Sequence, residues 1–168
     1  EPIYFQLEKA LQNPDKVYKL YADDLNTEPD SLWAALPRFV NLQQLTLEGE
    51  FFTAPPTALQ SLRPRLHSLT IKDNSQADWA ALFRLLADFR FLHTLQLENC
   101  DFPEQIPPKS IGDVRQLLHL SFAGSYLVDL PPTLGKLKNL QTLDLRSCQL
   151  TTLPAAALDL PTLTPLYA

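Results

Sequence analysis

The stretch LQTLDLRSCQLTTLP, residues 140–154, spaces its leucines at intervals that suit neither a helix nor a long strand. These leucines stand at 140, 143, 145, 150 and 153. Leu143 and Leu145, with Asp144 between them, predict a short strand whose leucines point inward and whose aspartate points outward. The chain then turns at Cys148, and the last two leucines are expected to close the core behind the strand.

The same pattern recurs along the chain. Its other copies are VYKLYADDLNT from residue 17, LQQLTLEGEFF from 42, LHSLTIKDNSQ from 66, LHTLQLENCDF from 92, LLHLSFAGSYL from 117 and a shortened LTPLYA from 163. Successive copies begin 23 to 26 residues apart, and a period of this size indicates a solenoid of stacked coils. Because a single coil leaves its apolar flank in water, neighbouring coils must stack, and their strands are expected to form one parallel sheet. Repeat positions are numbered below from the first residue of each copy.

The consensus L-x-x-L-x-L-x-x-N/C-x-L, followed by L-P, resembles the leucine-rich repeat, and LPPTLGKLKNLQTLDL at 130–145 is similar to bacterial or intracellular-type repeats. The resemblance covers residues 17–168 and is weakest in the copies that close on Thr27 and Gln76. It implies a right-handed α/β solenoid with a parallel concave sheet and with helices or 3-10 turns on the convex side. It also implies protein–protein interaction as the role, and an asparagine that bonds the backbone at position 9.

The repeat boundaries predict the domain organisation. Residues 1–168 are expected to form a single domain, made of an N-terminal capping helix in 1–16, six repeats over 17–162 and a partial terminal repeat at 163–168. The segment 3–12, IYFQLEKALQ, has the apolar spacing of an amphipathic helix. Pro165 falls inside the last strand, where proline fits only an edge, which indicates a natural end near Ala168, with a truncation in mid-repeat as the alternative. The sequence begins at Glu1 and contains no methionine, which leaves a removed export signal or an upstream domain open.

The segments that return from one strand to the next are of two kinds. Residues 31–39 and 77–89 both contain W-A-A-L and predict helices. Proline pairs at 55–56, 107–108 and 131–132 favour tighter, extended or single-turn geometry. We therefore expect α-helices mainly in the N-terminal half, and 3-10 turns after about residue 125.

Composition narrows the class of protein. Hydrophobic residues make up 45% of the chain and charged residues 20%, which predicts a folded domain with a core. The net charge of -5 argues against a nucleic-acid partner, because binding to a phosphate backbone needs a basic face. No apolar run approaches the roughly 18 residues needed to span a bilayer.

Two cysteines occupy position 9, where the family carries asparagine. Cys100 and Cys148 are two repeats apart, and a strand spacing of about 4.8 Å would hold them about 10 Å apart, beyond the reach of a disulfide. We expect two free, buried, structural thiols, which neither require nor exclude an oxidising compartment.

Residues capable of catalysis or metal binding are few. His67 and His93 hold position 2, whereas His119 holds position 3 and faces the other way, so a shared metal site is not expected. A triad of His119, Ser121 and Asp144 can be drawn, but a shallow open sheet offers no pocket that excludes water. The sequence therefore predicts no catalytic residue, no metal and no cofactor.

What remains is the polar surface that strand alternation exposes. Positions 3, 5 and 7 of the repeats are expected to form three columns on the concave face, with their side chains about 4.8 Å apart from strand to strand. The candidate binding residues are Lys19, Tyr21, Asp23, Gln44, Thr46, Glu48, Thr70, Lys72, Thr94, Gln96, Glu98, His119, Ser121, Asp144 and Arg146. The first repeats carry acidic side chains in the third of these columns, which is complementary to a basic patch on a partner.

These features predict a monomeric, non-catalytic module that binds another protein or an extended peptide. One alternative is the recognition domain of a larger exported or effector protein whose active part lies outside this sequence. A hydrolase and a cell-surface spacer are further alternatives. Export to the periplasm, the cell surface or the medium is favoured over the cytoplasm.

Overall fold

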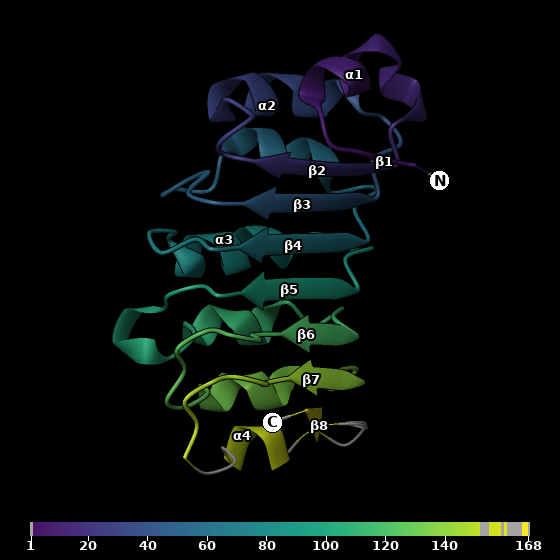
Figure 1. Ribbon diagram of the computed structural model, residues 1–168. Coiled ribbons are helices and arrows are strands. Elements are labelled where there is room, and N and C mark those ends of the chain that lie inside the picture. Colours follow the sequence, from purple (N-terminus) through teal and green to yellow (C-terminus); the bar gives the residue numbers. More distant parts are fainter. Residues whose placement is uncertain (1, 152–154, 159, 161–165, 168) are drawn as a thin grey trace.

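A single parallel sheet runs the length of the molecule, and the helices and 3-10 turns lie behind it (Figure 1). The computed structural model describes residues 2–151, 155–158, 160 and 166–167. The eight strands follow one another in chain order. They are β1 (Ile3–Tyr4), β2 (Lys19–Asp23), β3 (Gln44–Glu48), β4 (Ser68–Lys72), β5 (Thr94–Glu98), β6 (His119–Ser121), β7 (Thr142–Asp144) and β8 (Leu166–Tyr167). The right-handed α/β solenoid predicted from the repeats is thus confirmed.

The pairing register follows the predicted repeat positions. Each of the strands β2 to β7 begins at position 3, and the position-3 residues pair in the order Lys19, Gln44, Ser68, Thr94, His119 and Thr142. In β8, Leu166 pairs with Leu143 at position 4. The predictions for Leu153 and Pro165 fall outside the described residues. The spacing of leucines in one short stretch therefore indicated the alignment of the whole sheet.

The core lies between the sheet and the returning segments. Leucines at positions 1, 4 and 6 are almost fully buried, as Leu92, Leu95 and Leu97 show in one coil. Burial of a leucine side chain contributes about 1.5–3 kcal/mol, so stacking several such coils supplies most of the drive to fold. Leu150 is only half-buried, which differs from the expectation that it closes the core.

The returns include both helices and 3-10 turns. The α-helices are α2 (Pro29–Ala35), α3 (Trp79–Leu86) and α4 (Ala155–Leu158), and the 3-10 helices behind the sheet are η2 (Leu36–Arg38), η3 (Thr57–Leu62), η5 (Lys109–Asp113) and η6 (Pro132–Lys136). A further 3-10 turn, η4, spans Pro103–Gln105. The helix predicted at 77–89 is confirmed with shorter bounds, and the one predicted at 31–39 is found two residues earlier as α2, with η2 completing the segment. The expected start of 3-10 geometry after residue 125 is wrong, since η3 and η5 come earlier.

Proline pairs explain where the 3-10 turns occur. Pro56, Pro108 and Pro131 are the N-cap residues of η3, η5 and η6, with ψ of 140°, 147° and 142°. Proline fixes its own φ and holds the residue before it extended, so each turn starts only at or after the second proline of the pair and little of the return is left for a helix. Helix α3 has no such pair and instead begins at Asp78, whose side chain accepts a hydrogen bond from the Ala81 amide at 2.9 Å.

The N-terminal segment differs from the single helix expected over 3–12. Residues Ile3–Tyr4 form β1, which pairs with β2, and the helix α1 covers only Leu7–Gln12, followed by η1 (Pro14–Lys16). Pairing with β1 satisfies backbone groups that would otherwise leave β2 as an open edge. Ile3 is 50% exposed and so lies outside the apolar helix face assigned to it, whereas Leu7 and Leu11 pack against the core as expected.

Side chains at position 9 bond to the backbone of neighbouring coils. Asn74 donates to the carbonyl oxygens of Gly49 and Phe52 at 3.3 and 3.4 Å. Cys148 donates from its sulfur to the Phe122 carbonyl at 3.2 Å, and Cys100 to the Ile71 carbonyl at 3.6 Å. Both cysteines are free thiols; Cys100 is buried as expected, but Cys148 is only partly buried. Burial raises the pKa of Cys100 to about 12 and that of Cys148 to about 11. In the described part of the chain, no helix is long and apolar enough to cross a membrane.

Candidate functional site

The face of β2–β7 turned away from the helices carries the side chains at positions 3, 5 and 7, and we call it the open sheet face (Figure 1). Columns at positions 3 and 5 run unbroken from β2 to β7. The column at position 7 belongs to the ladder only in β2–β5, because β6 and β7 end at Ser121 and Asp144. The Asn99 amide still donates to the Ala123 carbonyl at 3.1 Å, so the backbone continues alongside without strand geometry.

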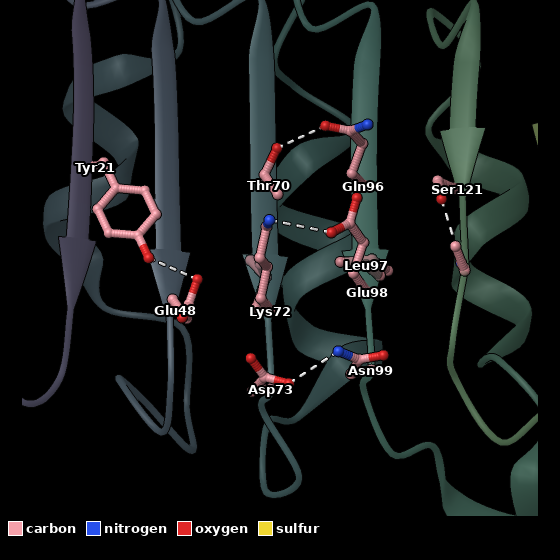
Figure 2. A network of polar contacts seen from close by, with 12 residues as sticks. Tyr21, Glu48, Thr70, Lys72, Asp73, Gln96, Leu97, Glu98, Asn99 and Ser121 are labelled. Atoms are coloured by element: carbon pink, nitrogen blue, oxygen red, sulfur yellow. Dashed lines mark hydrogen bonds and ion pairs between the residues drawn. The ribbon is translucent and has the colours of Figure 1, made fainter. Parts of the chain in front are cut away.

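Neighbouring strands hold one another's side chains on this face (Figure 2). The Thr70 hydroxyl donates to Oε1 of Gln96 at 2.9 Å. Two residues further along the same strands, Nζ of Lys72 lies 3.2 Å from Oε2 of Glu98. Such cross-strand pairs each contribute about 0.2–1 kcal/mol, and they also fix rotamers before any partner arrives.

Two of the predicted binding residues are not accessible. Thr70 is 6% exposed and Ser121 is 7% exposed, although both stand in the outward column at position 5. The Thr70 hydroxyl donates its hydrogen bond to the Gln96 side chain, and the Ser121 hydroxyl accepts a hydrogen bond from the Ala123 amide at 3.2 Å. Their short side chains lie below the longer ones beside them, so they support the face and leave contact with a partner to their neighbours.

Tyr21 is the aromatic residue of the open sheet face at the β2 end. Its hydroxyl donates to Oε2 of Glu48 at 2.6 Å, and its ring lies 5.4 Å from that of Phe5, tilted by 51°. The hydrogen bond to Glu48, together with burial and nearby acidic charges, raises the pKa of Tyr21 to about 12. Phe5 was not among the predicted site residues; its place beside the first strand depends on β1, which sequence reasoning assigned to a helix.

An acidic hollow of about 340 Å³ adjoins Tyr21. Asp23, Asp24, Glu48 and Asp73 line it together with the turn at Gly49. Gly49 has φ of 105°, and a Cβ there would lie 2.2 Å from the Asp24 carboxyl, so only glycine fits. The Asp24 carboxylate in turn accepts from the Glu50 amide at 2.8 Å. Several carboxylates are therefore held close together at this end of the face, and they favour the binding of a cationic group.

The β7 end of the face is closer to neutral. Asp144 binds the guanidinium of Arg146 through both oxygens, with the shortest contact at 2.6 Å. This hydrogen bonding lowers the pKa of Asp144. Nδ1 of His119 lies 2.8 Å from the Thr142 hydroxyl, and the two border a shallow hollow of about 140 Å³. The charge of Arg146, expected to face a partner, is therefore largely matched within the chain.

The triad drawn from the sequence is not assembled. The His119 ring bonds Thr142, Ser121 bonds backbone, and Asp144 binds Arg146, so no hydrogen bond links the three. His67 and His93 lie in the turns before β4 and β5, with ring centroids 6.2 Å apart, whereas His119 is the first residue of β6. Within the residues that the structure describes, no group of three His, Cys, Asp or Glu side chains could hold a metal ion.

A second ladder, at the residue just before each position 1, was missed by sequence reasoning. The Asn41 amide donates to the Asp15 carbonyl at 2.7 Å, and the Asn139 amide to the Arg115 carbonyl at 3.2 Å. Nε of Arg65 donates to the Phe39 carbonyl at 3.1 Å, and the side-chain amide of Gln116 donates to the Phe89 carbonyl at 3.0 Å. The sequence did carry a signal for this ladder, because four coils have a side chain with a hydrogen-bond donor at this same position.

Comparisons with known proteins agree with this geometry. A family model described as a leucine-rich repeat region matches residues 66–168. A leucine-rich repeat protein of Leptospira interrogans is 26% identical, with a TM-score of 0.74 over 99% of this chain and 46% of that one. An internalin of Listeria monocytogenes is 17% identical, with a TM-score of 0.59 over 87% of this chain and 45% of that one.

A more distant structure shares the fold. The ectodomain of a membrane receptor kinase of Arabidopsis thaliana, in complex with Casparian strip integrity factor 2, is 24% identical with a TM-score of 0.50, over 88% of this chain and 20% of that one. No curated protein sequence matches the chain. The chain spans less than half the length of the Leptospira and Listeria structures. Since the family model covers well over half of its 168 residues, the chain belongs to the leucine-rich repeat family.

Proposed function

We propose that the open sheet face binds another protein or an extended peptide, and that a basic segment of this partner lies over the β2–β4 end. The acidic hollow beside Tyr21 is the observation that carries the proposal. Three carboxylates line it next to an aromatic ring: Asp23 and Glu48 at the ends of β2 and β3, and Asp73 in the turn after β4. An aromatic residue with a polar tip, surrounded by charge of one sign, is a common centre of protein interfaces.

The rigidity of the face supports this role. Side chains such as Lys72, Glu98 and Gln96 already have cross-strand partners, so a ligand loses little free energy in ordering them. The plant ectodomain that shares the fold was solved with a second molecule bound, which is a precedent for the fold as a binding scaffold. The leucine-rich repeat family, to which the chain belongs, gives the same general expectation.

Charge reversal tests the proposal. The probe is a fluorescent synthetic peptide with alternating lysine and serine residues, followed by anisotropy at low and at physiological salt. Asp23→Lys plus Glu48→Lys is expected to weaken binding about tenfold or more, because like charges then face each other. The matched control is Asp30→Lys plus Asp113→Lys, which makes the same change of charge at exposed residues of α2 and η5.

Equal losses in the two variants would sink the proposal, since the peptide would then sense only the net charge. Tyr21→Phe adds a finer test, because it removes the hydroxyl that bonds Glu48 but keeps the ring beside Phe5. We expect this variant to retain most of the affinity if the ring is the anchor.

We further propose that residues 1–168 act as one monomeric, non-catalytic unit, with 1–16 covering the first repeat, 17–162 forming six repeats and 163–168 beginning another. The unit is proposed to serve as the recognition part of a longer exported protein, since the solved bacterial relatives are about twice its length. A hydrolase screen with His119→Ala tests the catalytic alternative: any activity that this substitution abolished would contradict the proposal.

A further inference from the structure

The edge of the sheet opposite the acidic hollow carries charge of the other sign. The turns that precede the strands contain basic side chains in successive coils. We call them the basic edge: Arg38, Arg63, Arg65, Arg90, Arg115, Lys136 and Lys138. Adjacent coils place these turns side by side, since Arg63 lies 3.2 Å from Asp88 of the next coil. A basic strip on a chain of net charge -5 is a local feature that the overall composition does not suggest.

The donor ladder along this edge is interrupted at one coil. Asn41, Arg65, Gln116 and Asn139 each bond the backbone of the preceding coil from the residue before position 1. The coil that begins at residue 92 has Phe91 at this place, and its ring is 47% exposed. In this coil, an exposed aromatic ring therefore stands at the position where the other coils carry a side chain that bonds the backbone. This position lies at the middle of the basic edge.

The interruption has a recess and unmatched polar atoms beside it. A hollow of about 300 Å³ is lined by Arg63, Pro64, Asp88, Arg90 and Phe91. Within the described residues, three buried side-chain nitrogen atoms have no hydrogen-bond partner, and all belong to the segment 63–67. They are Nε of Arg63, Nη2 of Arg65 and Nδ1 of His67. Arg63 lines the recess, and the His67 ring lies 6.0 Å from that of Phe91, so two of these three groups lie beside it.

The pattern of charge selects the kind of partner. Asp88 and Asp113 stand two residues before Arg90 and Arg115, so negative groups alternate with the positive ones along the edge. A nucleic-acid backbone, with its closely spaced phosphates, would meet these two carboxylates at the middle of the edge. A peptide with separated acidic residues can match the arginines alone, and an apolar side chain between them can fill the recess against Phe91.

We infer that the basic edge is a second docking surface, separate from the open sheet face, for an acidic peptide segment of a partner protein. Carboxylates of the segment pair with Arg90 and Arg115, neither of which forms an ion pair among the described residues. One aromatic or aliphatic side chain of the segment lies in the recess beside Phe91.

The test uses a labelled 14-residue synthetic peptide with glutamate at every third position and one central tyrosine, measured by anisotropy. Arg90→Glu plus Arg115→Glu is expected to weaken binding about tenfold or more. The control, Lys9→Glu plus Lys109→Glu, makes the same change of charge at two exposed lysines on α1 and η5 and is expected to leave affinity within about twofold.

Phe91→Asn separates binding from folding. Asparagine restores the donor found at Asn41 and Asn139, so the melting temperature is expected to hold or rise while the peptide binds about tenfold more weakly. Wild-type affinity in this variant would overturn the inference, as would equal weakening by the lysine control or no binding at millimolar peptide. Tighter binding of heparin or duplex DNA, unaffected by Phe91→Asn, would also overturn it.

Discussion

Two kinds of returning segment, α-helices and 3-10 turns, cover the face of the sheet that packs into the core. Helix α3 and turn η6 show the contrast between them. In α3 the indole of Trp79 lies 5.0 Å from the ring of Phe102 and donates to the Asp101 carbonyl at 2.6 Å. In η6, which follows a proline pair, Leu134 is the buried residue of the turn. The coil with α3 spans 26 residues and the coil with η6 spans 23, yet their strands begin at the same repeat position.

The difference teaches that coil length depends on the return and not on the strand. In this pair, the helix rises about 1.5 Å per residue and buries a tryptophan over the sheet, whereas the 3-10 turn rises about 2.0 Å per residue and buries a leucine. The strand side stays constant because its hydrogen bonds must match those of both neighbours. Insertions are therefore tolerated behind the sheet.

Removal of the large aromatic should give the biggest effect. We expect Trp79→Ala to lower the free energy of unfolding by about 3–5 kcal/mol, because the side chain is 1% exposed and its N–H has a partner. Urea unfolding monitored by circular dichroism measures this change. Trp33→Ala is the comparison, since Trp33 holds the same W-A-A-L place in α2 but is only partly buried. An equal cost for both tryptophans would contradict the view that the α3 return is the more deeply packed.

Removal of a core leucine should lower the free energy of unfolding by a similar amount in the two types of coil. Leu95→Ala and Leu143→Ala each empty a fully buried site at position 4, so we expect a loss of about 2–5 kcal/mol from either. Because β5 and β7 share their register with both neighbours, the two values are expected to agree closely. An unchanged midpoint for Leu143→Ala in urea unfolding would show that the assigned repeat frame is wrong.

Loss of the helix cap should affect one kind of return only. Asp78→Ala removes the acceptor for the Ala81 amide and is expected to cost about 0.5–2 kcal/mol. Thr57→Ala is the matched control at the start of η3. The N-cap residue of that turn, Pro56, makes no side-chain hydrogen bond, and Thr57 is exposed. We expect this second variant to stay within about 0.5 kcal/mol of the wild type.

The two thiols should show the smallest effect, a difference in labelling rate. Burial raises the pKa of Cys100 to about 12 and that of Cys148 to about 11, against about 8.5 for a free cysteine. The stability that neutral thiols give is therefore complete below about pH 8.5 and falls as pH rises toward 11 and then 12. At pH 8 we expect Ellman's reagent to react slowly with Cys148 and more slowly with Cys100. Faster labelling of Cys100, compared through Cys148→Ser and Cys100→Ser, would reverse the predicted order.

Local alternation was enough to predict the strands β2–β7, but not β1. Leucines at positions 4 and 6 flank one polar residue, and this pattern, repeated at a constant period, determines both the register and the outward columns. The proline pairs also had a readable meaning, but the prediction tied 3-10 turns to a place in the chain, whereas Pro56 and Pro108 already begin such turns earlier.

Features that depend on distant neighbours were out of reach of sequence reasoning. The burial of Thr70 depends on the longer Gln96 of the next strand, which a single strand does not reveal. The stacking of Phe5 on Tyr21 needs β1 to pair as a strand, although its short segment also reads as the start of a helix. The recess at Phe91 is lined by residues of two adjacent coils, Arg63 and Pro64 from one and Asp88, Arg90 and Phe91 from the next.

The strict chain order of the strands also bears on how such a molecule can change in size. Each coil meets only the coils before and after it, and equivalent residues stand in register, as Gln44 and Ser68 do. Excision of residues 45–68 would join two chain ends that already lie at matching points of adjacent turns, and the ribbon would shorten by about 4.8 Å. Gene duplications and deletions of whole coils can thus alter the reach of the protein in discrete steps without redesign of its interior.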